Sequence, residues 1–223
     1  MCRNLVSWRP FDDIFHLKEI ARTSPYAHTT ALRPWGKLLN PLNLLKKYFD
    51  GNEKGFDIVY EHSRLVAGKA LTVALSQGLE GSVLKFIEEA ALLHDIGVVG
   101  TNTPRLGCRG TASYLCHGIL GRGILEREGY PEHGLVCERH IGVGLTLEDI
   151  ISQDLPLPLR EMTPVTISQR IICFADLFYT KKPDRIDREL TPDEVRRGLA
   201  RFGEKKVETF DAWLREFLPS SGG

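Results

Sequence analysis

The amino-acid sequence predicts an all-α fold, and three observations lead to this prediction. Apolar residues recur at helical spacing in several stretches of the 223-residue chain. Pairs such as Thr191 with Pro192 stand where such stretches begin, and they are typical of helix starts. No run alternates apolar and polar residues as a half-buried strand does, and no internal repeat is visible. We therefore expect helices joined by loops.

The first 54 residues predict an N-terminal helical extension. Residues 10–22 and 38–50 read as short amphipathic helices, and Pro25 and Pro34 interrupt the stretch between them. From residue 56 a longer helix is expected, because Phe56, Val59 and later apolar residues share one face. His62 occupies a slot in the same face, so its side chain should point inward.

A second long helix should begin near Ser82, a plausible N-cap, and end at Gly97. His94 and Asp95 would lie in its last turn, about 100° apart around the axis, so that one can bind an ion while the other bridges to a second. The Gly- and Pro-containing stretch 98–113 predicts a loop long enough to border a site.

Helical patterns return at residues 113–128 and from Pro131 to about residue 141. Thr163 and Pro164 suit the N-cap and first position of a further helix, whose apolar face carries Asp176. A carboxylate on such a face needs a partner. Residues 183–223 predict a linker and then a long C-terminal helix that packs on the core, begun by a capping box at Thr191 and Glu194.

Composition restricts the partners and the compartment. The 29 basic and 29 acidic residues cancel, so no global field would attract a nucleic-acid polymer or a membrane surface. Five cysteines without a C-x-x-C pair suggest neither disulfides nor a thiolate zinc site. With no signal peptide or membrane span visible, we expect a cytoplasmic protein.

Several segments resemble one known family. Histidine and aspartate bind divalent metal ions, but a single His-Asp dipeptide is weak support, so the surrounding segments matter. The segments are EHSRLVAGKAL at 61–71, AALLHDIG at 90–97, CHGILGRGIL at 116–125, ERHIGVGLT at 138–146 and ICFADLF at 172–178. Together, over residues 56–182, they resemble the HD domain, and most closely an HDIG-type subgroup of uncharacterised metal-dependent phosphohydrolases.

The resemblance implies a helical bundle over residues 55–182 that holds one or two divalent transition-metal ions, such as Fe or Mn. His62, His94, Asp95 and Asp176 would bind one ion, His117 and His140 would complete a second position, and Asp95 would bridge. His94 and Asp95 would be the catalytic residues. The implied reaction is hydrolysis of a phosphate ester of a nucleotide or another small molecule by metal-activated water.

Two departures disfavour a cyclic-dinucleotide phosphodiesterase. The chain reads HDIGVV where many such relatives read HDIGK, and its Gly129-Tyr130-Pro131 tripeptide precedes His140 rather than following the corresponding histidine. Arg122, Arg139 and His133 are candidate substrate-binding residues, because they lie near the metal motifs and could grip phosphate or line a pocket. Lys181 and Lys182 are read as solvated residues at a helix end. A homodimer is possible.

Two other functions stay open at this point. Some HD-domain proteins use the same ligand set as mixed-valence di-iron oxygenases, and the sequence alone does not exclude that chemistry. A non-catalytic binding or regulatory module is the second alternative, although degenerate domains of that sort usually lack ligands and none is missing here.

Overall fold

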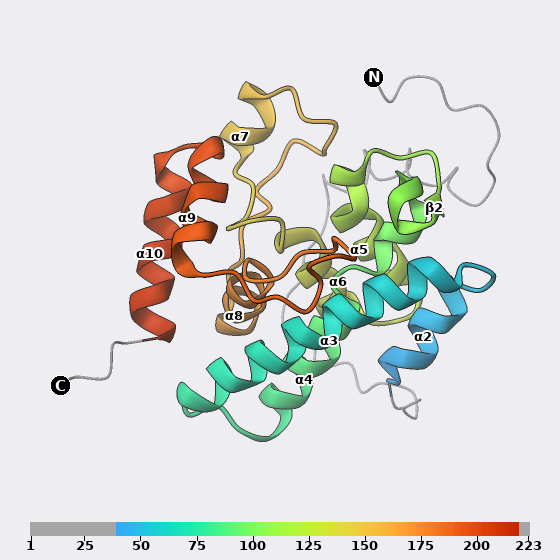
Figure 1. Cartoon of the computed structure of the whole chain (residues 1–223), viewed down its shortest axis with the longest axis horizontal. Helices are drawn as coiled ribbons and strands as arrows, with labels where there is room; N and C mark the ends of the chain where they lie inside the picture. Colours follow the sequence, from blue (N-terminus) through green and yellow to red (C-terminus); the bar gives the residue numbers. More distant parts are fainter. Residues whose placement is uncertain (1–38, 219–223) are drawn as a thin grey trace, which may run out of the picture. The chain divides into compact units, whose positions relative to one another are not determined.

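The computed structural model describes residues 39–218, and helices dominate this part of the chain (Figure 1). The helices are α2 (Pro41–Tyr48), α3 (Glu53–Ser76), α4 (Gly81–Leu93), α5 (His117–Arg127), α6 (Pro131–Arg139), α7 (Leu147–Ser152), α8 (Ile167–Asp176), α9 (Pro192–Leu199) and α10 (Glu204–Phe217). Short 3-10 helices are η2 (Ile96–Gly100), η3 (Pro104–Leu106), η4 (Tyr114–Cys116) and η5 (Ala200–Phe202). The all-α prediction is confirmed.

The predicted loop 98–113 contains local structure that its sequence does not reveal. Strands β1 (Asn102–Thr103) and β2 (Cys108–Arg109) pair antiparallel, with Asn102 opposite Arg109. At this length a strand has no alternating pattern that could be recognised. The hairpin encloses η3 and brings Thr103 and Arg105 to the wall of a pocket that also touches Asp176.

Helix α4 and its end differ from the prediction. Ser82 lies inside α4, whose N-cap is Glu80 without a side-chain bond. The helix ends at Leu93, so His94 and Asp95 follow it. Gly97 serves close packing rather than termination, because a Cβ atom there would lie 2.0 Å from the carbonyl oxygen of His117. This contact lets the start of α5 approach η2.

Helix α8 starts later than predicted. The proposed cap at Thr163 is wrong, because the helix begins at Ile167 and Thr166 is its N-cap. The Thr166 hydroxyl accepts a bond from the backbone N–H of Gln169, while the Gln169 side chain accepts bonds from the N–H groups of Val165 and Thr166. This reciprocal capping box keeps the chain extended up to Thr166.

The central packing joins α3, α4 and α8, and a second layer joins α5 with α6 and η2. In Figure 1, α4 lies along the long α3 helix. Fully buried alanines, such as Ala70 on α3 and Ala90 on α4, contribute to the core between these helices. Small side chains allow the backbones to approach, which fixes the positions of His62 and His94 relative to one another.

The C-terminal region forms two helices, so the prediction of one long helix is wrong. The chain turns at Gly203, whose φ of 113° an L side chain rarely adopts. As predicted, this region packs on the core: α10 contacts α8, and Phe210 and Phe217 are completely buried. Phe202 falls in the turn between the two helices and stays 58% exposed.

The N-terminal prediction can be followed only from residue 39. The predicted helix 10–22 lies outside the described residues, whereas the one at 38–50 corresponds to α2, which contacts α3 and α4. The division into segments 1–54, 55–182 and 183–223 stays a prediction. Within residues 39–218, no helix combines the length and apolar character needed to cross a membrane.

Candidate metal centre

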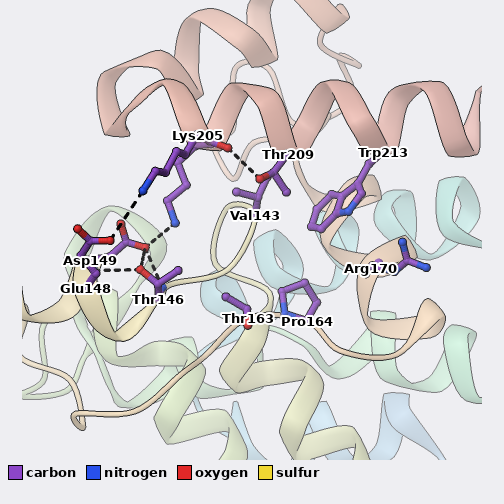
Figure 2. Close-up of a pocket in the computed structure, with 11 residues that line it drawn as sticks. Val143, Thr146, Glu148, Asp149, Thr163, Pro164, Arg170, Lys205, Thr209 and Trp213 are labelled. Carbon is purple, nitrogen blue, oxygen red and sulfur yellow. Dashed lines mark hydrogen bonds and ion pairs between the residues drawn. The ribbon is translucent and has the colours of Figure 1, made fainter.

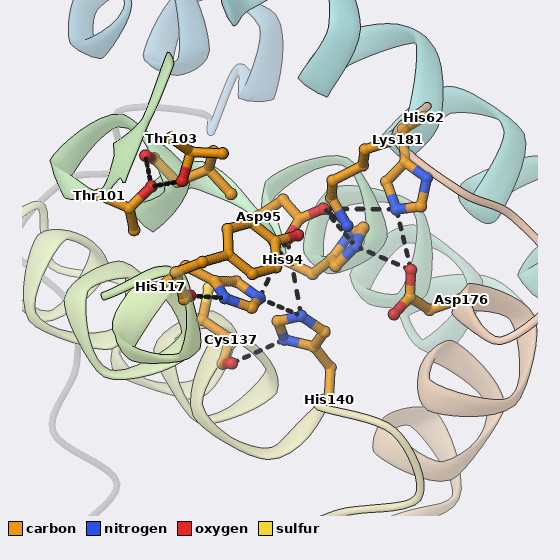
Figure 3. A network of polar contacts seen from close by, with 12 residues as sticks. His62, His94, Asp95, Thr101, Thr103, His117, Cys137, His140, Asp176 and Lys181 are labelled. Atoms are coloured by element: carbon orange, nitrogen blue, oxygen red, sulfur yellow. Dashed lines mark hydrogen bonds and ion pairs between the residues drawn. The ribbon is translucent and has the colours of Figure 1, made fainter. Parts of the chain in front are cut away.

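Five of the six predicted ligands lie at the ends of helices. His94 and Asp95 follow α4, His117 is the first residue of α5, His140 follows α6, and Asp176 is the last residue of α8. The sixth, His62, lies on the buried face of α3. Figure 3 shows that all six side chains converge on one point, although they come from five helical segments.

Asp95 lies at the middle of this cluster and is completely buried. Its Oδ2 atom is 3.3 Å from His62 Nε2 and 3.1 Å from His94 Nε2. Its Oδ1 atom is 3.3 Å from His117 Nε2 and 3.6 Å from His140 Nε2. The two oxygens of one carboxylate therefore face two different pairs of imidazoles.

Asp176 completes the Oδ2 side of the cluster. Its Oδ1 atom is 2.9 Å from His62 Nε2 and 3.4 Å from His94 Nε2. Two groups of side chains could hold a metal ion by the proximity of their ligand atoms, namely His62, His94 and Asp176, and His94, Asp95 and His140. His117 adjoins the second group, with its Nε2 atom 3.0 Å from that of His140.

Backbone carbonyls fix the orientation of three imidazoles. The Nδ1 atoms of His94, His117 and His140 lie 2.6, 2.6 and 2.7 Å from the carbonyl oxygens of the residues three positions earlier. Carbonyls in the last turn of a helix lack intrahelical partners, so His94 and His140, which follow α4 and α6, can each satisfy one. Because Nδ1–H donates there, the Nε2 atom of each ring, when the imidazole is neutral, presents its lone pair to the cluster.

These lone pairs and oxygens lack ordinary hydrogen-bond partners. The buried Nε2 atom of His94 and both carboxylate oxygens of Asp95 make no hydrogen bond of normal geometry within residues 39–218, although Lys181 forms an ion pair with Asp95 Oδ2 at 2.6 Å. Two Nε2 lone pairs at 3.0 Å, those of His117 and His140, repel unless a proton or a cation lies between them. Buried acceptors gathered in this way fit a divalent ion, and the His/Asp donor set suits Fe²⁺ or Mn²⁺.

The electrostatics of the cluster lower the pKa of two of its histidines and raise the pKa of a third. Burial and the nearby Lys181 lower the pKa of His62 to about 4, and burial together with His140 lowers the pKa of His117 to about 3. Burial also opposes the charged form of His94, but Asp95 and Asp176 outweigh it and raise its pKa to about 10. Burial opposes ionisation of Asp95 as well, yet His94 and Lys181 hold its pKa well below the usual range.

Two buried cysteines next to the cluster are not suited to bind metal. The Cys137 thiol donates to the carbonyl of Leu93, and the Cys173 thiol donates to the carbonyl of Arg139. Burial raises the pKa of both thiols well above the ordinary value, so they remain protonated. Their bonds instead hold the backbone beside His94 and His140.

Lys181 belongs to the cluster, although the sequence suggested a solvated helix end. Its Nζ atom lies 2.6 Å from Asp95 Oδ2, and only 13% of its side chain is exposed (Figure 3). Burial works against its charge, but Asp95 and then other neighbours outweigh burial and raise its pKa. Nothing in the sequence pattern distinguishes Lys181 from the exposed Lys182, because the chain after α8 has no helical period.

A pocket of about 360 Å³ opens beside the cluster. Its lining includes Asp176, Lys181 and Tyr114, whose ring stacks on that of His117 with centroids 4.7 Å apart. Thr103 and Arg105 from the segment between β1 and β2 also line the pocket. The loop predicted to border the site therefore does so.

The structure places the three predicted substrate-binding residues away from this pocket. Arg122 bonds to Glu126 at 2.7 Å and to Glu138 at 2.5 Å, and Arg139 donates to the Gln169 side chain. His133 lies 3.4 Å from Glu89 and packs on Phe86. None of the three lines the pocket beside Asp176, so a role in binding substrate stays a prediction without geometric support.

A second pocket of about 400 Å³ lies between α10 and the segment around α7 (Figure 2). Its charged side chains pair with nearby carboxylates: Lys206 lies 2.5 Å from Asp149, and Arg170 lies 2.7 Å from Glu216. No residue of the His/Asp cluster lines it. We regard this pocket as a packing feature of the C-terminal helix.

Comparisons with known proteins agree with the geometry. The HD domain family profile matches residues 59–180. The uncharacterized protein MJ0778 of Methanocaldococcus jannaschii is 34% identical over 155 residues, which cover 67% of this chain and 83% of that protein. A tRNA (cytidine(56)-2'-O)-methyltransferase of Picrophilus torridus is 26% identical over 166 residues, covering 59% of this chain but only 45% of that protein.

Among solved structures, the chain is similar to the HD domain of the L. monocytogenes phosphodiesterase PgpH. The TM-score is 0.45 at 17% identity, covering 78% of this chain and 96% of that domain. For the same domain in complex with cyclic-di-AMP, the TM-score is 0.44 at 18% identity, with 81% and 99% covered. Because the HD domain profile spans more than half of the chain, and a relative 34% identical is covered over 83% of its length, the protein belongs to the HD-domain family.

Proposed function

We propose that the protein is a metal-dependent phosphohydrolase that cleaves a phosphate ester of a nucleotide or another small molecule. The observation that carries the proposal is the convergence of imidazole Nε2 atoms on the two oxygens of Asp95. A carboxylate that faces ligands on both sides is the arrangement that a pair of bridged ions requires.

In this proposal His62, His94, Asp95 and Asp176 would hold one divalent ion, and His117, His140 and Asp95 would hold a second. Iron or manganese suits this donor set better than softer ions, because all its atoms are imidazole nitrogens or carboxylate oxygens. Such ions, when bound, lower the pKa of a coordinated water toward neutrality and neutralise charge on a phosphoryl oxygen.

The protein's own contribution is to orient the ligands and exclude bulk water. The Nδ1–carbonyl bonds of His94, His117 and His140 keep each Nε2 atom directed inward. His62, His94 and Asp95 are completely buried, whereas the Asp176 side chain is 15% exposed and lines the pocket. A phosphate ester would therefore reach the centre from the Asp176 side.

The test is phosphate release from a panel of nucleotides and small phosphate esters by protein loaded with Mn²⁺ or Fe²⁺. We expect hydrolysis that EDTA abolishes and that falls at least about 1,000-fold in Asp95→Asn and His117→Ala, because both substitutions remove a ligand of the reacting centre. Lys205→Met is the matched control, since Lys205 is 89% exposed on its side chain and lies on α10, outside the centre.

The proposal would be wrong if no substrate in the panel were hydrolysed with either metal. Turnover that requires iron and consumes oxygen would instead support the di-iron oxygenase. Full activity of both ligand variants would mean that the cluster is not the reacting centre.

A further inference from the structure

Lys181 lies between the buried ligands and the pocket beside them. Its ammonium lies 2.6 Å from Asp95 Oδ2, the oxygen that also faces His62 and His94. The same side chain lines the pocket beside Asp176. Lys181 thus lies at the boundary between the buried ligands and the opening through which a substrate would arrive.

The positive charge of the Lys181 ammonium disfavours the binding of a divalent metal ion at Asp95. A divalent ion bound to Asp95 Oδ2, His62 and His94 would lie within a few ångströms of Lys181, and like charges at such a distance repel strongly in a buried site. Metal binding would therefore require Lys181 to give up its contact with Asp95. Its flexible four-carbon stem allows the ammonium to move while the backbone stays in place.

On its other side the ammonium faces a pocket with a positive wall. Among the described residues that line the pocket, Arg105, Lys181 and Lys182 carry positive charge, and Asp176 carries the one carboxylate. An ammonium has three N–H donors and no acceptor, so an anionic oxygen is its natural partner once Asp95 is engaged elsewhere. A phosphate group entering this pocket supplies such oxygens.

We propose that Lys181 is the phosphate ligand of the centre and that its charge couples phosphate binding to metal binding. The inference rests on the proposed function and adds a residue that the sequence did not indicate. In the metal-free protein Lys181 neutralises Asp95. When Asp95 binds metal, Lys181 turns to a non-bridging oxygen of the substrate phosphate, so the same side chain weakens metal binding and strengthens phosphate binding.

The test measures two equilibria and needs no turnover. Mn²⁺ affinity is obtained from the electron paramagnetic resonance signal of the free ion, and affinity for inorganic phosphate is obtained by calorimetry at saturating Mn²⁺. In Lys181→Met we expect Mn²⁺ affinity to rise about tenfold and phosphate affinity to fall about tenfold, since one charge acts on both ligands with opposite sign. Lys181→Gln should shift both affinities in the same directions.

Lys205→Met is the matched control, because the Lys205 side chain is 89% exposed on α10 and lines no part of the pocket beside Asp176. We expect it to change Mn²⁺ affinity less than about twofold, as expected for a screened surface charge. Thermal unfolding of all variants confirms that they are folded.

Two results would overturn the inference. If wild type binds Mn²⁺ and phosphate but Lys181→Met and Lys181→Gln leave both affinities unchanged, Lys181 is a structural ion-pair partner only, and the proposed function stands. If both affinities fall together, Lys181 supports the fold of the centre instead of opposing the ion. If the wild-type protein binds no Mn²⁺, the proposed metal centre is contradicted, and this inference is contradicted with it.

Discussion

Helix α8 joins two regions whose side chains are stabilised in opposite ways. Its buried Phe174 lies among Phe178, Phe210 and Phe217, with ring centroids 5.0 to 5.8 Å apart. Two residues further along, Asp176 lies against His62 and His94. The four rings of the first region are hydrocarbon, whereas the imidazoles and carboxylates of the second are groups that water would solvate well.

The difference indicates how stability and function are divided. Burying aromatic rings stabilises the fold by roughly 25 cal/mol for each Å² removed from water. Burying Asp95, His62 and His94 costs free energy unless the charges are compensated. The aromatic region therefore fixes the end of α8 in space, and the cluster uses that fixed position to hold ionisable groups together.

The largest expected effect is a loss of stability in Phe174→Ala. Truncating this completely buried ring leaves a cavity between α8 and α10, which should lower the free energy of unfolding by about 4 kcal/mol. Urea denaturation measures this change. If the account is correct, the loss is the same with and without Mn²⁺; a loss below about 1 kcal/mol would show that the aromatic region does not support the fold.

The complementary substitution on the same helix is Asp176→Asn. It keeps the shape of the side chain but removes a negatively charged ligand, so metal-dependent activity should fall at least about 100-fold. Stability of the metal-free protein should fall less than in Phe174→Ala, although Asn loses the interactions with Lys181, His62 and His94 that hold the pKa of Asp176 low. Steady-state kinetics and urea denaturation of the same preparation test both statements. An equal loss of stability in both variants would contradict the distinction between the aromatic region and the His/Asp cluster.

Acid should weaken the polar region selectively. Between about pH 6.5 and pH 4.5, His62 and His117 bind protons in the unfolded chain but stay neutral in the folded one, because burial lowers their pKa values to about 4 and about 3. His94, with its pKa raised to about 10, is protonated in both states over this window.

The unfolded state therefore binds more protons, and stability of the metal-free protein should fall as pH falls, by about 2 kcal/mol for each of the two histidines over this window. Urea midpoints at the two pH values measure the change. His62→Gln should remove part of the pH dependence of the urea midpoint. Phe174→Ala should lower the midpoint at both pH values and leave its pH dependence unchanged. Midpoints independent of pH would contradict neutral buried histidines.

A smaller effect concerns the start of the shared helix. Thr166→Ala removes the side-chain oxygen that caps α8, and such losses cost about 1 kcal/mol. Thr163→Ala is the control, because the sequence suggested a cap there and the structure assigns none. Thermal unfolding of the two variants should rank Thr166→Ala as the less stable; the reverse order would place the helix start at Thr163.

The same contrast explains which features the sequence predicted. Periodic apolar residues and the motif residues His62, His94, Asp95, His117, His140 and Asp176 could be identified because each depends on local spacing or a recognisable segment. Helix ends were less predictable: Thr163-Pro164 and Thr166 are both plausible starts for α8, and only the reciprocal bonds of Gln169 decide between them.

The position of Lys181 could not be predicted, because it depends on the path of the chain after α8. Residues 177–183 lack a period, and two adjacent lysines have opposite surroundings, one against Asp95 and the other exposed. Similarly, Arg122 was a reasonable phosphate ligand by position, but Glu126 and Glu138 engage it. Pairings between distant elements are set by tertiary packing, which local patterns do not encode.

The most direct test of the metal centre is elemental analysis of protein purified without added metal. Wild type, Asp95→Ala, His117→Ala and Phe174→Ala would be compared per folded chain. The account predicts about two ions per chain in wild type and in Phe174→Ala, and one or none in the two ligand variants, as a bridged pair requires. Absence of metal from wild type, or a content that both ligand substitutions leave unchanged, would contradict it.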